Sequence, residues 1–247
     1  MNRQYLDPIF RGRYPPALPR IFGEAWPTFP ASDLEHIRRP IDFLGINYYK
    51  RGVIRHDPAA LPLRAAPVRP PGRTYTETGW EVYAPGLTDI LLWVRRRYGA
   101  LPLYICENGA AFYDPPAGDA PIEDPLRVRY LRDHLRAAHD AMRRGVDLRG
   151  YFVWSLLDNF EWSLGFSKRF GIVHVDYATQ RRTPKASARF YAEVIRTGGG
   201  SLGGNGAATP RRAGAASARR TGGAGRPRPR GRGARPRSGP GRARASR

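Results

Sequence analysis

The sequence has little cysteine and no long apolar run. Cys106 is its only cysteine, which excludes a disulfide within the chain and fits a reducing compartment. No charged and then apolar segment at the N-terminus indicates export, and no run approaches the roughly 20 apolar residues of a membrane span. We therefore expect a soluble, cytoplasmic protein without a membrane partner. These features predict no particular oligomeric state.

Acidic and aromatic residues are absent from residues 198–247, which contain thirteen arginines and one large aliphatic residue, Leu202. Such a segment cannot bury enough apolar surface to offset the entropy cost of ordering. We predict two parts, a folded part at 1–197 and a disordered Arg/Gly/Pro/Ala-rich tail at 198–247. The tail carries +13 of the formal net charge of +21, so the folded part, at +8, is moderately basic.

The tail has two alternative interpretations, a genuine basic arm that binds nucleic acid and the product of a shifted reading frame. Thirteen arginines could bind RNA or DNA without sequence specificity and with strong salt dependence. A dedicated single-strand binder would also carry aromatic residues for base stacking, and this tail has none, so we do not expect nucleic acid to be the main partner. Gly, Ala, Arg, Pro and Ser all have GC-rich codons, which favours a shifted reading frame as the source of the tail.

Strands and helices alternate along the remaining chain. The first forty residues form a connecting segment with a short helix near 33–38, and residues 50–84 form a long loop of the kind that is usually functional. Parallel βαβ units are the expected fold, and near-continuous apolar strands indicate a sheet that is covered on both faces. The predicted strands are 41–49, 103–106 and 150–156, and the predicted helices are 85–99, 125–145 and 184–196.

Two α/β architectures fit this order, a doubly wound open sheet and part of a (β/α)8 barrel. Uncommon polar and aromatic groups follow the three strands: Asn47-Tyr48-Tyr49, Glu107-Asn108, and Trp154 leading to Asp158-Asn159. A barrel builds its active site from such residues at the C-terminal ends of several parallel strands. No glycine-rich phosphate loop follows a strand, which disfavours nucleotide binding. The sequence therefore favours the barrel.

Three motifs in order strengthen this interpretation: DFLGINYY, YICENGAA and GYFVWSLLDNFEWSLGFSKRFGIVHVD. At these spacings they resemble the last three barrel strands of glycoside hydrolase family 1, the family of β-glucosidases and their relatives. The similarity covers about residues 3–197, including the LDPIFRGRYP connector and the TPKASARFYAEVI helix. It implies the C-terminal portion of a TIM barrel, about its last three βα units.

The resemblance implies retaining hydrolysis of a terminal β-D-glucoside, without a cofactor. Retention requires one carboxylate as nucleophile and a second as acid and base, about 5 to 5.5 Å apart. Glu107 would be the nucleophile, Tyr49 would donate a hydrogen bond to it, and Asn47 would lie beside it. Asn108 we interpret as a turn former. Without the resemblance, Glu107 is equally well a solvated acid in an Asn-Gly turn, and Asn47 and Tyr49 are ordinary residues of the barrel rim.

A second group of residues concerns sugar recognition. An indole face suits the C–H side of a pyranose, and a buried carboxylate can accept hydrogen bonds from two neighbouring hydroxyls. By resemblance, Glu161 and Trp162 bind the outer hydroxyls, while Trp154 and Phe170 line the pocket; core packing is the alternative for the two aromatic residues. Retention of an acid at Glu161 favours unphosphorylated β-glucosides, or also β-galactosides or β-fucosides, over 6-phospho-β-glycosides, although Lys168 leaves that alternative open.

The acid/base glutamate of the family lies in an Asn-Glu-Pro motif, which this sequence lacks. Glu24, Glu35, Glu77 and Glu81 lie in connectors or loops and do not match it. We therefore expect a fragment that begins before the sixth barrel strand, with Met1 an internal methionine or a misassigned start. Such a fragment would bear the nucleophile half of the site and be inactive, or nearly so, without an upstream part.

Metal chemistry gains no support from the sequence. The five histidines show no ligand spacing, and we interpret those on helices, His134 and His139, as surface residues. Cys106 should point away from Glu107, because alternate strand residues face opposite sides, and we assign it to packing.

Overall fold

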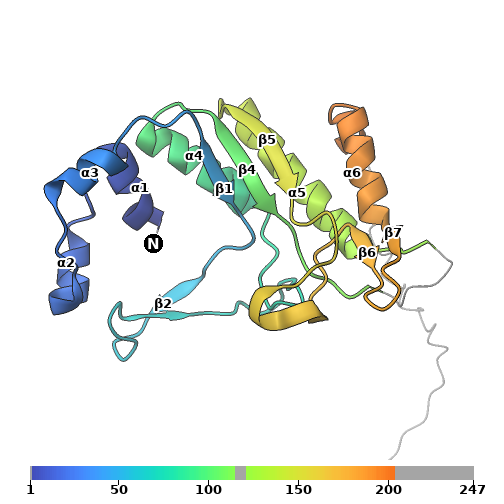
Figure 1. Ribbon diagram of the computed structural model, residues 1–247, viewed down its shortest axis with the longest axis horizontal. Helices are drawn as coiled ribbons and strands as arrows, with labels where there is room; N and C mark the ends of the chain where they lie inside the picture. The colour runs from blue at the N-terminus through green and yellow to red at the C-terminus, as the bar shows by residue number, and fades with distance from the viewer. Residues whose placement is uncertain (1, 115–120, 204–247) are drawn as a thin grey trace, which may run out of the picture. The chain divides into compact units, whose positions relative to one another are not determined.

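The central sheet has three parallel strands in the order β1-β4-β5 (Figure 1). They are β1 (Leu44–Asn47), β4 (Leu103–Asn108) and β5 (Leu148–Val153). Relative to the sequence prediction, β1 is shorter, β4 extends two residues further and β5 begins and ends a few residues earlier. The computed structural model describes residues 2–114 and 121–203. Parallel pairing brings the C-terminal ends of the three strands to the same edge of the sheet.

Two long helices cover one face of this sheet. Helix α4 (Pro85–Tyr98) begins with a proline at its first turn and is followed by Gly99, and α5 (Pro125–Arg143) likewise begins at a proline. Their apolar positions recur at intervals of three and four residues, so each helix presents one apolar stripe. These stripes pack on Leu103 and Ile105 of β4 and form the main core of the described chain.

The other face of the sheet is open in the part of the chain that the structure describes. Along β4, Leu103 and Ile105 are buried, whereas Cys106 is exposed. On β5, Phe152 is 57% exposed. The prediction of a sheet covered on both faces is therefore wrong for these residues, because α4 and α5 both pack on the same face as Leu103 and Ile105.

The N-terminal region is more regular than expected. It contains α1 (Asn2–Arg11), α2 (Ala17–Phe22), the short helix η1 (Gly23–Ala25) and α3 (Ala31–Ile37), of which only α3 was predicted. Buried Asp7 fixes α1 to the end of α4, because it accepts hydrogen bonds from the Tyr98 hydroxyl at 2.6 Å and from Arg97. The predicted loop at 50–84 contains the antiparallel pair β2 (Ile54–His56) and β3 (Ala65–Pro67) and a bridge between Tyr75 and Glu81.

The C-terminal elements follow β5. They are η2 (Trp162–Ser167), the antiparallel strands β6 (Val173–Val175) and β7 (Arg182–Pro184), α6 (Ala186–Arg196) and η3 (Gly200–Leu202). The guanidinium of Arg136 on α5 donates twice to the carbonyl of Leu202. The described chain thus continues six residues beyond the predicted boundary at 197. The rest of the predicted tail lies outside the described residues. Among those that are described, no helix combines the length and apolar character needed to cross a membrane.

Candidate active site

Glu107 and Tyr49 meet at the C-terminal edge of the sheet. Asn47, the last residue of β1, is the register partner of Glu107 on β4, with a register shift at this point of the pairing. Two residues further on, the Tyr49 hydroxyl donates a 2.5 Å hydrogen bond to Oε2 of Glu107. The structure therefore brings the predicted residues Asn47, Tyr49 and Glu107 together, and it gives the half-buried carboxylate a fixed donor.

Tyr49 remains a proton donor over the whole physiological range. Burial raises the pKa of its hydroxyl far above the usual value, and the hydrogen bond to the Glu107 carboxylate raises it further. The negative charge of Glu161, on the loop after β5, also contributes to the raised pKa of Tyr49. The predicted sugar-binding acid Glu161 is thus close enough to the Tyr49–Glu107 pair for its charge to act there.

Three aromatic rings, those of Tyr49, Trp80 and Phe170, form a cluster. The ring centroid of Tyr49 lies 5.2 Å from that of Trp80 and 6.2 Å from that of Phe170, and Trp80 and Phe170 are 6.0 Å apart. Phe170 was a predicted pocket residue and is only 2% exposed, so the cluster is packed. Trp80 was missed: the length of the loop at 50–84 indicated function, but nothing local in the sequence showed which of its residues returns to the sheet.

The two tryptophans predicted to contact sugar differ in their surroundings. The amide of Trp154 donates to the carbonyl of Asn108 across 3.0 Å, so the chain after β5 is fixed beside the chain after Glu107. The peptide bond between Trp154 and Ser155 is cis. Trp162 is 80% exposed. Among the ring contacts of the described chain, none joins Trp162 to Tyr49, Trp80 or Phe170.

A buried group of charges contacts the residues on either side of Phe170. Lys185 is fully buried, and its Nζ donates to Asp114 at 2.5 Å and to Asp158 at 2.9 Å. Asp158 also accepts from the Arg169 guanidinium and the Gly171 amide, the two residues that flank Phe170. Burial lowers the pKa of Lys185, which the neighbouring carboxylates oppose. Sequence reasoning missed this group, which fixes the loop after β4 and the loop after β5 to each other.

Three sequence interpretations require correction. Asn108 is not a turn former but the fully buried last residue of β4. Cys106, assigned to packing, is exposed and not packed in a core, because that face of the sheet is open in the described chain. His134 is fully buried on α5, whereas His139 is exposed as predicted. The described residues contain no group of three or more His, Cys, Asp or Glu side chains that could hold a metal ion.

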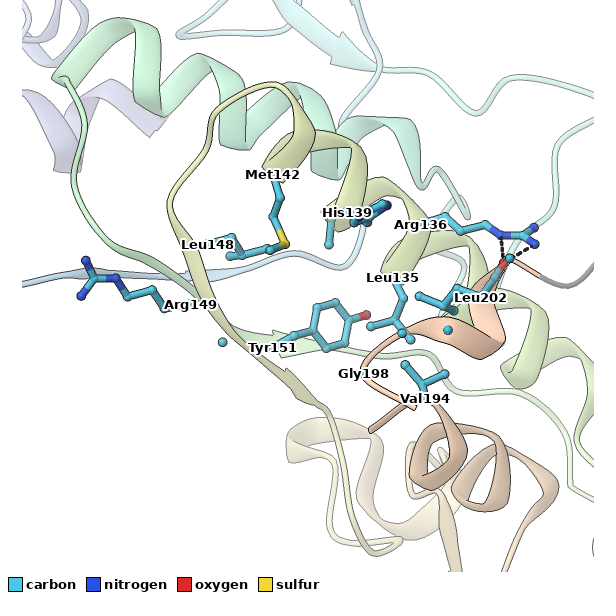
Figure 2. Close-up of a pocket in the computed structure, with 15 residues that line it drawn as sticks. Leu135, Arg136, His139, Met142, Leu148, Arg149, Tyr151, Val194, Gly198 and Leu202 are labelled. Carbon is cyan, nitrogen blue, oxygen red and sulfur yellow. Dashed lines mark hydrogen bonds between the residues drawn. The ribbon is translucent and has the colours of Figure 1, made fainter. Parts of the chain in front are cut away.

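Two cavities lie away from Glu107. One, of about 650 Å³, lies between α5, the start of β5 and the end of α6 (Figure 2). Its walls are mainly apolar and include Leu135, Met142, Leu148, Tyr151 and Val194. The other, of about 690 Å³, lies along α4 and includes Asn47 and Tyr48. Only Asn47 of the predicted site residues lines either cavity.

Comparison with known proteins identifies the family. The model of glycosyl hydrolase family 1 matches residues 1–200. Thermostable β-glucosidase B of Thermobispora bispora is 48% identical over 202 residues, which are 80% of this chain and 42% of that protein. A bifunctional β-D-glucosidase/β-D-fucosidase of Bifidobacterium breve is 38% identical over 78% of this chain and 46% of its own length.

The solved family 1 β-glucosidase of Thermotoga maritima superposes with a TM-score of 0.76 at 43% identity, over 80% of this chain and 44% of that one. The chain therefore spans less than half the length of the relatives it matches. This similarity confirms the predicted α/β fold as a portion of a family 1 barrel. The chain belongs to glycosyl hydrolase family 1.

Proposed function

We propose that Glu107 is the nucleophile for retaining hydrolysis of β-glucosides. The observation that carries this proposal is the 2.5 Å hydrogen bond from Tyr49 to Glu107 at the C-terminal edge of the sheet. A carboxylate oxygen of Glu107 would attack the anomeric carbon and form an ester bond. At the same time the bond from the anomeric carbon to the leaving oxygen would break, and the leaving oxygen would keep the electron pair. Tyr49 would keep the attacking carboxylate oriented, because its hydroxyl remains protonated.

The activity of this chain is limited by the second carboxylate, for which the sequence offers no matching residue. Protonation of a poor leaving group and activation of water both require an acid/base residue. The sequence has no Asn-Glu-Pro motif. Glu81 does not suit the role of the acid: Nε and Nη2 of Arg51 donate to its two carboxylate oxygens at 2.8 and 2.9 Å, and this bidentate pair holds the pKa of Glu81 below the usual value. We therefore propose that the chain alone carries the nucleophile half and hydrolyses unactivated glucosides very slowly or not at all.

Unphosphorylated β-glucosides are the proposed substrates. The family relatives compared above are β-glucosidases, and one is also a β-fucosidase, which supports β-fucosides as a further substrate class. The charge of Glu161 acts at Tyr49, so a phosphate in this region would be repelled. The 6-phospho alternative depends on the positive charge of Lys168. Its Nζ lies 4.0 Å from Oε2 of Glu77, and this carboxylate partly neutralises that charge. The proposed chemistry uses carboxylates and water and requires no cofactor.

Release of p-nitrophenol from p-nitrophenyl β-glucoside tests this proposal. The purified chain is compared with a longer polypeptide that extends its N-terminus by the strands and the Asn-Glu-Pro motif of a family relative. We expect activity in the longer polypeptide, loss of that activity on Glu107→Gln, and at most a trace in the chain alone. Robust activity of the chain alone would contradict the proposed need for the second carboxylate. Activity that survives Glu107→Gln in the longer polypeptide would exclude Glu107 as nucleophile.

A further inference from the structure

Asn108, the residue after Glu107, uses its side chain entirely inside the protein. It is fully buried at the end of β4. Its Nδ2 donates to the carbonyl of Tyr48 at 2.6 Å and to the hydroxyl of Tyr130 at 3.1 Å, and its Oδ1 accepts from the hydroxyl of Tyr151. A buried amide with these partners leaves little freedom to rotate, because each partner that is lost leaves a polar group unpaired.

The partners allow only one orientation of this amide. The carbonyl of Tyr48 can only accept a hydrogen bond, so the atom that faces it must be the nitrogen. The oxygen then faces the hydroxyl of Tyr151, which lies on β5 and also lines the cavity in Figure 2. Tyr151 is held in turn, since its carbonyl accepts from the Tyr191 hydroxyl of α6 at 2.8 Å. Asn108 thus connects the residue that follows β1 to β5 and α5 from a position next to Glu107.

These hydrogen bonds hold Tyr49 from both sides. Asn108 binds the Tyr48 carbonyl, which is part of the peptide unit that leads into Tyr49. The Tyr130 hydroxyl, which accepts from Asn108, lies 3.4 Å from the carbonyl of Tyr49 and donates to it. The amide of Tyr48 also donates to the carbonyl of Glu107 at 2.9 Å. The backbone of Tyr49 is therefore fixed relative to Glu107 at the two peptide units that flank it.

We propose that Asn108 is a positioning residue for the nucleophile: its side chain fixes the backbone of Tyr49 so that the Tyr49 hydroxyl meets Glu107. This inference rests on the function proposed above for Glu107, and it adds a role that the Asn-Gly pattern of the sequence did not indicate. A small displacement of Tyr49 would suffice to lose the contact, because hydrogen bonds weaken steeply with distance and angle. Misplacement by about 1 Å at a reacting centre can lower a rate about a hundredfold.

Fluorine NMR of the chain labelled with fluorotyrosine tests this role without any need for catalysis. The variant Tyr49→Phe assigns the Tyr49 resonance, and Glu107→Gln gives its position when the charged acceptor is removed. We expect Asn108→Asp, which is nearly isosteric but cannot donate to the Tyr48 carbonyl, to move this resonance toward its Glu107→Gln position. Asn108→Ala should do the same. An unchanged Tyr49 resonance in either folded variant would overturn the proposal.

Tyr98→Phe is the control, because it also removes one side-chain hydrogen bond, from the Tyr98 hydroxyl to Asp7, but at the end of α4 and away from Asn108. We expect it to leave the Tyr49 resonance where it is. If neither Asn108 variant folds, Tyr151→Phe tests the proposal instead. It removes only the donor to Oδ1 of Asn108 and should move the Tyr49 resonance toward its Glu107→Gln position. No movement in Tyr151→Phe would then count against the proposal.

A kinetic readout separates positioning from general damage. A dinitrophenyl β-glucoside with fluorine in place of the hydroxyl next to the anomeric carbon needs no acid, because dinitrophenolate is a weak base that leaves with its electron pair. The fluorine slows hydrolysis of the resulting ester, so the sugar stays on the nucleophile. We expect Asn108→Asp to lower the maximal rate of labelling about tenfold or more, with little change in the concentration for half-maximal rate.

The two readouts distinguish the two proposals. If the unaltered chain is not labelled at all, the function proposed for this chain fails, while the fluorine resonance still tests the role of Asn108. If the chain is labelled and Asn108→Asp changes only the half-maximal concentration, Asn108 supports sugar binding and the positioning role is wrong.

Discussion

The Tyr49 hydroxyl donates to Oε2 of Glu107 across 2.5 Å and thereby joins the chain just after β1 to β4. Hydrogen bonds to a charged group contribute about 1.5–3 kcal/mol, and this one acts on the atom proposed to react. Tyr49→Phe keeps the ring that packs on Trp80 and Phe170. We expect it to lower the rate of Glu107 labelling about tenfold or more, measured by intact mass against time.

Tyr98→Phe provides a control for this comparison. Tyr98 also donates to a buried carboxylate, that of Asp7 at 2.6 Å, but on α4 and away from the site. Tyr98→Phe should lower the free energy of unfolding and leave the labelling rate of the folded protein unchanged. Equal losses of rate in Tyr49→Phe and Tyr98→Phe would show that the tyrosine contact at Glu107 has no special role.

Gly109 is required by the close approach of the chain after β5. A Cβ atom at this position would lie 1.7 Å from the carbonyl oxygen of Trp154, which is a backbone atom and cannot move aside. We expect Gly109→Ala to destabilise the protein by about 3 kcal/mol or more, measured by urea unfolding, because overpacking against fixed backbone cannot relax. Gly52→Ala is the control: no atom lies within 4 Å of its added Cβ. Equal stability of the two variants would contradict the observed packing.

Lys185 should be essential for stability. Its replacement by Met would remove the cation that Asp114 and Asp158 share and leave each carboxylate with one arginine, Arg127 or Arg169, so we expect a loss of about 3 kcal/mol, the lower end of the range for breaking a buried pair. We expect this loss in the free energy of unfolding, measured with urea, together with faster hydrogen exchange at 109–114 and 155–171. Arg196→Met removes an exposed pair with Glu193 and should change neither quantity measurably. Slow exchange at both loops in Lys185→Met would show that the lysine does not join them.

His134 should make stability depend on pH. Burial lowers its pKa from 6.5 to about 4 in the folded protein, so the folded state disfavours the charged ring. The stability linked to neutral His134 is complete above pH 6.5 and is lost as the pH falls toward 4, by about 3 kcal/mol in total. The free energy of unfolding of His134→Phe, which keeps an aromatic ring against Tyr130, should fall less over this window.

His139→Gln, an exposed position on the same helix, should follow the unaltered protein over the same range. Buried His174 also has a lowered pKa and will leave some pH dependence in the His134 variant. Parallel curves for the unaltered protein and His134→Phe would mean that His134 does not resist protonation in the folded state.

Features that depend on local pattern and strand order could be predicted from the sequence. The starts of α4 and α5 followed from their prolines and apolar spacing, and the meeting of Tyr49 with Glu107 followed from the family resemblance together with parallel strands. Strand alternation also predicted that Cys106 points away from Glu107. The exposure of Cys106 was not predicted, because it depends on what covers the far face of the sheet.

Features that depend on contacts between distant segments could not be predicted. Asn-Gly is typical of turns, and only the three tyrosine partners of Asn108, brought from β5, α5 and the residue after β1, make it a buried strand residue. A lysine at the start of a helix usually suggests an exposed side chain. Lys185 is buried because Asp114 and Asp158 converge on it from loops far away in the sequence.

The most direct test of the central claim is the site of covalent labelling by the fluorinated dinitrophenyl β-glucoside. After incubation with the chain, intact mass and peptide mass spectrometry would locate the sugar. We predict one fluoroglucosyl group per chain, attached to the peptide that contains Glu107, and no label on Glu107→Gln. A label on another carboxylate, or no label on a folded chain, would contradict the assignment of Glu107 as the nucleophile that this chain can use.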